Sequence, residues 1–90
     1  MMRRVNILVS GRVQGVYFRA FTQKKARQLA IRGSVKNLPD GRVEIIAEAE
    51  HHVLEPFIQW CHKGPVTARV DHVEITDLKP DKSLTVFEIK

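Results

Sequence analysis

The stretch "GSVKNLPDGRVEIIAEAE", residues 33–50, decides the fold because it reads as strand, turn and strand. Pro39-Asp40-Gly41 predicts the turn, since proline presets φ and glycine accepts a positive φ. After the turn, apolar and polar residues alternate, which predicts a strand with one buried face. The apolar positions are Val43, Ile45 and Ala47, and the polar positions, expected to point outward, are Arg42, Glu44 and Glu48.

A helix is predicted before this hairpin, from about Ala20 to Ile31, because apolar residues return at helical spacing. The residues near its apolar face are Phe18, Thr22, Ala26, Leu29 and Ala30. Gly33 suits the left-handed position just past the helix end, and Arg32 suits the negative end of the helix dipole. The basic residues elsewhere on the helix are expected to form a solvated face; they include Lys24, Lys25 and Arg27.

A second helix is predicted after the hairpin, where apolar residues recur at i, i+4 and i+7. The stripe consists of Val53, Leu54, Phe57, Ile58, Trp60 and Cys61. We expect Pro56 in the first turn of this helix, because the first four N–H groups of a helix lack intrahelical partners. The helix should end before Gly64-Pro65, and Cys61 should behave as a small buried hydrophobe.

Three further stretches read as strands at the two ends of the chain. "RVNILVSG", residues 4–11, places three apolar residues on one side: Val5, Ile7 and Val9. In "ARVDHVEI", residues 68–75, the apolar parity changes between Val70 and Val73, which predicts a β-bulge. In "LTVFEI", residues 84–89, Phe87 and Ile89 are expected to face inward.

The element order is therefore β-α-β-β-α-β, with the last strand region split in two. This order predicts an α+β fold of the ferredoxin-like, split βαβ type, with an antiparallel sheet and two helices on one face. At 90 residues, we expect a single domain spanning residues 1–90.

The charge balance points to an anionic ligand. Fifteen Lys and Arg residues against ten Asp and Glu give a net charge of +5, which attracts nucleic acid, membrane headgroups or a small phosphorylated substrate. No stretch approaches the roughly 20 apolar residues that span a membrane. The single cysteine excludes an internal disulfide, and the apolar run near the N-terminus is too short for a signal peptide, so the expected location is the cytoplasm.

The stretch "GRVQGVYFR", residues 11–19, links the first strand to the first helix. Backbone N–H groups in a glycine-containing turn that enters a helix can form an anion-binding site, and the guanidinium of Arg19 could bind two phosphate oxygens. The alternative is a plain connection with a solvated arginine, which the spacing alone favours. Asn37 has a similar alternative as a turn-capping residue before Leu38-Pro39.

The residues 9–19, "VSGRVQGVYFR", resemble the signature of the acylphosphatase family at every constrained position. "GSVKNLPDGRV", residues 33–43, and "GPVTARVDHV", residues 64–73, are similar to two further stretches of that family, in the same order. The chain departs from the family pattern at Ser34, where an aromatic residue is usual, and at Ala49, where glycine is usual. Neither is a catalytic position of the family.

The resemblance implies hydrolysis of the carboxyl–phosphate bond of a small acyl phosphate, with inorganic phosphate as product and competitive ligand. It implies that Arg19 and the loop backbone hold the phosphoryl group and that Asn37 positions the attacking water. The substrate-binding loop residues are then Gln14, Gly15, Val16, Tyr17 and Phe18. The family requires no metal and no other cofactor.

Two other functions compete with this one. The RNA-recognition fold has the same element order, but it carries stacking aromatics on its central strands, and residues 41–48 contain none. The second competing function is a non-catalytic role, either as an anion-binding module or as a regulatory domain of a hydrogenase-maturation carbamoyltransferase. The chain end at Lys90 favours a free-standing enzyme. We expect a monomer with neither nucleic-acid nor membrane partners.

The histidines lack zinc-site spacing and are expected at the surface: His51, His52, His62 and His72.

Overall fold

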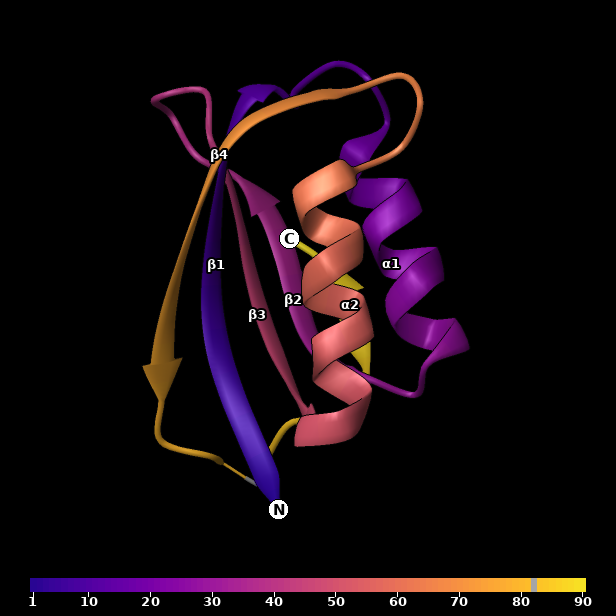
Figure 1. Ribbon diagram of the computed structural model, residues 1–90, viewed down its shortest axis with the longest axis vertical. Coiled ribbons are helices and arrows are strands. Elements are labelled where there is room, and N and C mark those ends of the chain that lie inside the picture. The colour runs from indigo at the N-terminus through magenta and orange to yellow at the C-terminus, as the bar shows by residue number, and fades with distance from the viewer. Residues whose placement is uncertain (82) are drawn as a thin grey trace.

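The computed structural model describes residues 1–81 and 83–90, and its elements follow the predicted order. In chain order they are β1 (Met2–Arg12), α1 (Phe18–Gln28), β2 (Arg32–Asn37), β3 (Val43–Glu50), α2 (His51–Lys63), β4 (Arg69–Leu78) and β5 (Phe87–Ile89). The strands form one sheet in the order β4-β1-β3-β2-β5, and both helices cover the same face of it (Figure 1). The predicted ferredoxin-like fold is confirmed.

The sheet differs from the prediction in one pairing. The pairs β1–β3, β1–β4 and β2–β3 are antiparallel, but β5 runs parallel to β2, so the sheet is mixed. The connection after β4 has to cross from one edge of the sheet to the other before β5 begins. β5 therefore forms an edge strand beside β2.

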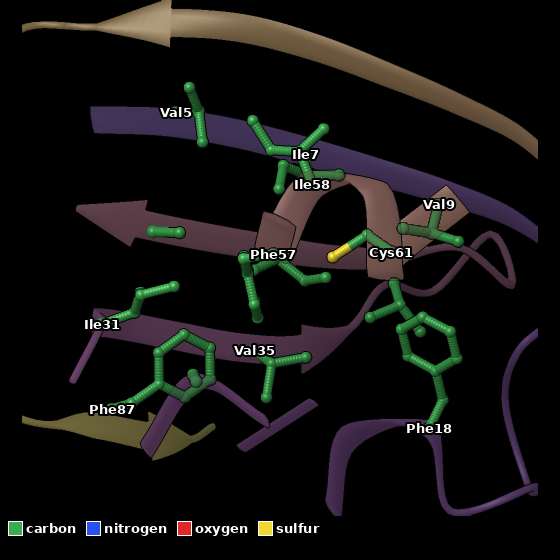
Figure 2. Packing of buried hydrophobic residues seen from close by; sticks show 14 of the residues in the cluster. Val5, Ile7, Val9, Phe18, Ile31, Val35, Phe57, Ile58, Cys61 and Phe87 are labelled. Atoms are coloured by element: carbon green, nitrogen blue, oxygen red, sulfur yellow. The ribbon is translucent and has the colours of Figure 1, made fainter. Parts of the chain in front are cut away.

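The core lies between the sheet and the two helices (Figure 2). The predicted inward residues of β1 pair with those of β3, and all of them are fully buried; the pairs are Val5 with Ala47, Ile7 with Ile45, and Val9 with Val43. The helices contribute buried side chains to the same cluster, among them Phe18, Ala26, Leu54, Phe57 and Cys61. The burial of Cys61 confirms the prediction made for it.

The end of α1 corrects the interpretation of Gly33. The helix lies about two residues nearer the N-terminus than predicted, and Ala30 adopts the left-handed conformation with φ 57°. The Ile31 N–H donates to the Ala26 carbonyl at 2.8 Å and the Ala30 N–H to the Arg27 carbonyl at 3.2 Å, which is a Schellman motif. Gly33 lies in β2 instead, where a Cβ would come within 1.8 Å of the carbonyl oxygen of Ile46. The glycine is needed for close strand approach.

The start of α2 corrects the placement of Pro56. The helix begins at His51, directly after β3, and the His51 N–H donates to the carbonyl of Met1 at 3.1 Å. Pro56 is therefore in the second turn, where it removes a bond to the carbonyl of His52. The helix ends at Lys63, before Gly64-Pro65, as predicted.

Glu48 is buried, with only 1% of its surface exposed, although it was expected to point outward. Its side chain does lie on the sheet face opposite the helices, as strand alternation requires. That face is covered at this point by the connection that follows β4, because the Asp81 N–H donates to Glu48 Oε1 at 2.8 Å. The Nε atom of Arg4 lies 3.9 Å from the same oxygen.

The predicted bulge is present between β1 and β4. Ser10 pairs with His72, whereas the next residue, Gly11, pairs with Val70. Asp71 is thus the extra residue of β4. The bulge lies at the end of β1 that leads into the connection to α1.

Candidate active site

The connection between β1 and α1 has two residues with positive φ, Gly15 at 74° and Tyr17 at 62°. Between them Val16 is buried, while the Tyr17 side chain is 76% exposed. Left-handed residues in a short turn direct successive backbone N–H groups to one side, which is the conformation of anion-binding nests. The chain then enters α1 directly, with Tyr17 in the N-cap position.

Three hydrogen bonds from two side chains, those of Gln14 and Thr67, hold this loop in place. The Nε2 atom of Gln14 donates to the carbonyls of Leu38 and Arg42, both at 2.9 Å, on the turn between β2 and β3. The Oγ1 atom of Thr67 donates to the carbonyl of Val16 at 2.7 Å. The side chains of Gln14 and Thr67 therefore fix the loop, and neither Gln14 nor Val16 lines the cleft at this end of α1.

The N-terminus of α1 carries unsatisfied donors. The first intrahelical bond joins the Phe21 N–H to the Tyr17 carbonyl at 3.1 Å, and Tyr17 supplies no side-chain cap. The N–H groups of Phe18, Arg19 and Ala20 thus have no partner inside the helix. The first turn contains no acidic residue, so the positive end of the helix dipole is not neutralised there.

A cleft of about 370 Å³ opens at this helix end. Its lining residues are Val13, Gly15, Tyr17, Phe18, Arg19, Ala20, Asn37 and Ile89. It thus brings together Arg19 from the first turn of α1 and Asn37 from the last position of β2. Five of the seven residues predicted for the site line the cleft.

Arg19 brings an unneutralised positive charge to the cleft. Within residues 1–81 and 83–90, no Asp or Glu side chain lies within ion-pair distance of its guanidinium. Its one hydrogen bond in that part of the chain is a long one, from Nη1 to the main-chain oxygen of Lys90 at 3.5 Å. A half-buried guanidinium with this little competition is free to bind an anion bidentately.

The side-chain amide of Asn37 is also available. Its Oδ1 atom is buried and has no hydrogen-bond partner among the described residues. The adjacent turn is closed without it, by the Leu38 N–H donating to the Arg42 carbonyl at 2.8 Å and by the Arg42 N–H donating to Asp40 Oδ1 at 3.0 Å. The bond from the Arg42 N–H is the main reason why the pKa of Asp40 is lowered. The turn-capping alternative for Asn37 therefore has no support from these contacts.

Ile89 was expected to face the core, but it is 41% exposed and forms a wall of the cleft. It shares its side of β5 with Phe87, which is buried, so alternation alone could not separate the two. The difference arises because the end of β5 lies beside the cleft and not under a helix. Sequence reasoning therefore missed this residue, together with Val13 and Ala20.

The other candidate groups lie away from the cleft. Burial raises the pKa of the Cys61 thiol, which keeps it protonated and unreactive. The histidines are exposed, as predicted: His51, His52, His62 and His72. Over residues 1–81 and 83–90, no three His, Cys, Asp or Glu side chains are grouped so that they could hold a metal ion. In the same ranges no helix has the length and apolar character needed to cross a membrane.

Comparison with known proteins gives a consistent result. The sequence model of the acylphosphatase family matches residues 5–89. An acylphosphatase of Marinobacter nauticus is 51% identical over 86 residues, which cover 96% of this chain and 94% of that protein. The crystal structure of an acylphosphatase from Bacillus subtilis superposes with a TM-score of 0.93 at 37% identity, covering 100% of this chain and 99% of that one.

A larger protein contains the same fold. HypF from T. kodakarensis superposes with a TM-score of 0.85 at 36% identity, over 98% of this chain but only 12% of that one. The match to the family over nearly the whole chain, at the identities found, confirms the resemblance predicted from residues 9–19 and with it the prediction of an enzyme. The chain belongs to the acylphosphatase family.

Proposed function

We propose that this protein hydrolyses the carboxyl–phosphate bond of acyl phosphates to a carboxylate and inorganic phosphate. The observation that carries the proposal is the composition of the cleft. Among the described residues, its lining combines a guanidinium without an Asp or Glu partner, backbone N–H groups without intrahelical partners, and an amide oxygen without a hydrogen-bond partner. The guanidinium and the N–H groups can bind a dianionic phosphoryl group, and the amide can bind a water molecule.

Arg19 and the backbone of residues 14–18 hold the phosphoryl group in this mechanism. The guanidinium and the N–H groups at the start of α1 neutralise the charge of the phosphoryl oxygens. Phosphoryl transfer needs positioning and charge stabilisation more than covalent chemistry, so preorganised donors can supply most of the catalysis.

Asn37 positions the nucleophile. Its amide accepts a hydrogen bond from a water whose oxygen attacks phosphorus in line with the bond to the acyl oxygen. As the new P–O bond forms, the bond to the acyl oxygen breaks, the carboxylate leaves, and the water proton passes to the phosphate. A carboxylate is a good leaving group, so the reaction needs no general acid. The described residues that line the cleft include no Asp, Glu or His.

The test uses benzoyl phosphate and three variants. Arg19→Gln should lose at least about a hundredfold in kcat/KM, because a charge-assisted contact to the reacting group is worth roughly 3 kcal/mol. Lys63→Gln removes the same charge from an exposed position at the end of α2, outside the cleft, and should stay within about twofold of the wild type.

Asn37→Ala separates binding from chemistry. Phosphate, measured by isothermal titration calorimetry, should bind with nearly unchanged affinity, while kcat falls at least about a hundredfold. A wild-type protein that binds phosphate but does not hydrolyse benzoyl phosphate would instead be an anion-binding module. Full activity in Asn37→Ala would remove this residue from the mechanism.

A further inference from the structure

A second hollow adjoins the cleft along α1. It has a volume of about 460 Å³ and is lined by Ala20, Gln23, Lys24, Arg27 and Gln28. Ala20 lines both hollows, so the two meet at the first turn of the helix. We propose that this cationic hollow is a subsite for a second anionic group, a carboxylate or phosphate at the far end of the acyl part of the substrate. The inference rests on the proposed function.

The charge around the hollow is not neutralised. The first 39 residues contain no Asp or Glu, although they contain nine Lys and Arg. Neither Lys24 nor Arg27 forms an ion pair within the part of the chain that the structure describes. The acidic residue of β5, Glu88, pairs with Ser34 and lies on the opposite side of the strand from Phe87 and Ile89. Lys24 and Arg27 are therefore available to bind an anion.

The spacing of the cations fits an elongated substrate. Ala20, Lys24 and Arg27 follow one another at i, i+4 and i+7, so they form one stripe on the helix. At 1.5 Å per residue, Lys24 and Arg27 lie about 6 Å and 10 Å along the axis from Ala20. A phosphoryl group held at the helix N-terminus would thus place a distal anion beside these side chains if the acyl part followed the helix.

The residue shared by the two hollows, Ala20, is apolar. Ile89 and Ala20 line the cleft, and Ala20 also lines the second hollow, so an acyl group that passes from one to the other meets the apolar side chain of Ala20. Gln23 donates from Nε2 to the carbonyl of Phe87 at 3.2 Å, which holds α1 against β5 along this path. The substrate class that matches is an acyl phosphate with an apolar spacer and a terminal anionic group.

The experiment compares two substrates with the same ring, 4-carboxybenzoyl phosphate and 4-methylbenzoyl phosphate. For the wild type we expect kcat/KM to favour the carboxylate, and the preference to shrink as ionic strength rises. In the double variant Lys24→Gln/Arg27→Gln the ratio of the two kcat/KM values should fall about three- to tenfold, the scale of two exposed ion pairs. Hydrolysis of 4-methylbenzoyl phosphate should remain within about twofold of the wild type.

The matched control is Lys25→Gln/Lys63→Gln, which removes the same net charge from residues that do not line the hollow. It should leave the substrate ratio unchanged. An unchanged ratio in Lys24→Gln/Arg27→Gln, or an equal fall in the control, would overturn the subsite. Absence of hydrolysis of both substrates by the wild type would instead contradict the proposed function, so the two failures are distinguishable.

Discussion

Gly15→Ala is the sharpest test of the loop as the phosphate site. Gly15 has φ 74°, and a Cβ added there would meet no heavy atom within 4 Å. The substitution therefore costs only the backbone strain of a left-handed alanine, about 1 kcal/mol. For a domain of this size that corresponds to a fall in Tm of about 4–8 °C. The added methyl group would, however, stand in the cleft, because Gly15 is one of its lining residues.

The chain supplies a matched control in Gly41. Its φ is 96°, a Cβ there also meets nothing within 4 Å, and it lies on the β2–β3 turn outside the cleft lining. Gly41→Ala should therefore show a similar fall in Tm. Because the backbone strain is similar in both variants, any difference between them in phosphate affinity reflects the position of Gly15 in the cleft.

The assay is the rise in Tm with inorganic phosphate, combined with calorimetric titration. Disturbing one charge-assisted N–H contact should weaken phosphate binding about tenfold. At a phosphate concentration of 100 times the wild-type Kd, ligand stabilisation is about 2.7 kcal/mol, and a tenfold weaker Kd reduces it to about 1.4 kcal/mol. Gly41→Ala should keep the full stabilisation. Wild-type phosphate affinity in Gly15→Ala, or equal loss in both variants, would refute the assignment of the loop.

Three other substitutions or treatments test the fold. Gly33→Ala should abolish cooperative unfolding in circular dichroism, because its Cβ would lie 1.8 Å from the Ile46 carbonyl oxygen; a variant that melts like the wild type would contradict this close approach. Ala30→Gly should raise the free energy of unfolding by about 0.5 kcal/mol, since glycine suits the left-handed position that ends α1; a lower Tm would count against the Schellman motif. The Cys61 thiol, whose pKa is raised by burial, should react with a thiol reagent only after unfolding in guanidinium; rapid labelling of the native protein would show that the helix opens.

The parts of the fold that depend on neighbouring residues could be predicted from the sequence. Alternation identified the buried side of β1 and β3, and a change of parity located the bulge in β4. The prediction for Gly33 was wrong, and the burial of the outward-facing Glu48 was not foreseen, because each residue is constrained by a segment distant in sequence. Gly33 is fixed by the backbone of β3, and Glu48 by the connection after β4. No local pattern contains these contacts.

The site was predicted in the same uneven way. Arg19 and Asn37 were named from the family resemblance, since spacing alone favoured a solvated arginine and a turn cap. Ile89 was missed because its exposure depends on where β5 ends relative to α1. Alternation gives the side of a strand on which a residue lies, but it does not say whether a helix covers that side.

Gln14 shows why a residue's place in a motif does not reveal how it acts. The resemblance placed it among the substrate-binding residues, yet its side chain is bonded to the carbonyls of Leu38 and Arg42. Both carbonyls belong to the turn that begins directly after Asn37. One side chain thus sets the spacing between the loop that would hold the phosphoryl group and the amide that would hold the water. Since in-line attack depends on that spacing, Gln14 would support catalysis by positioning, without contacting the substrate through its side chain.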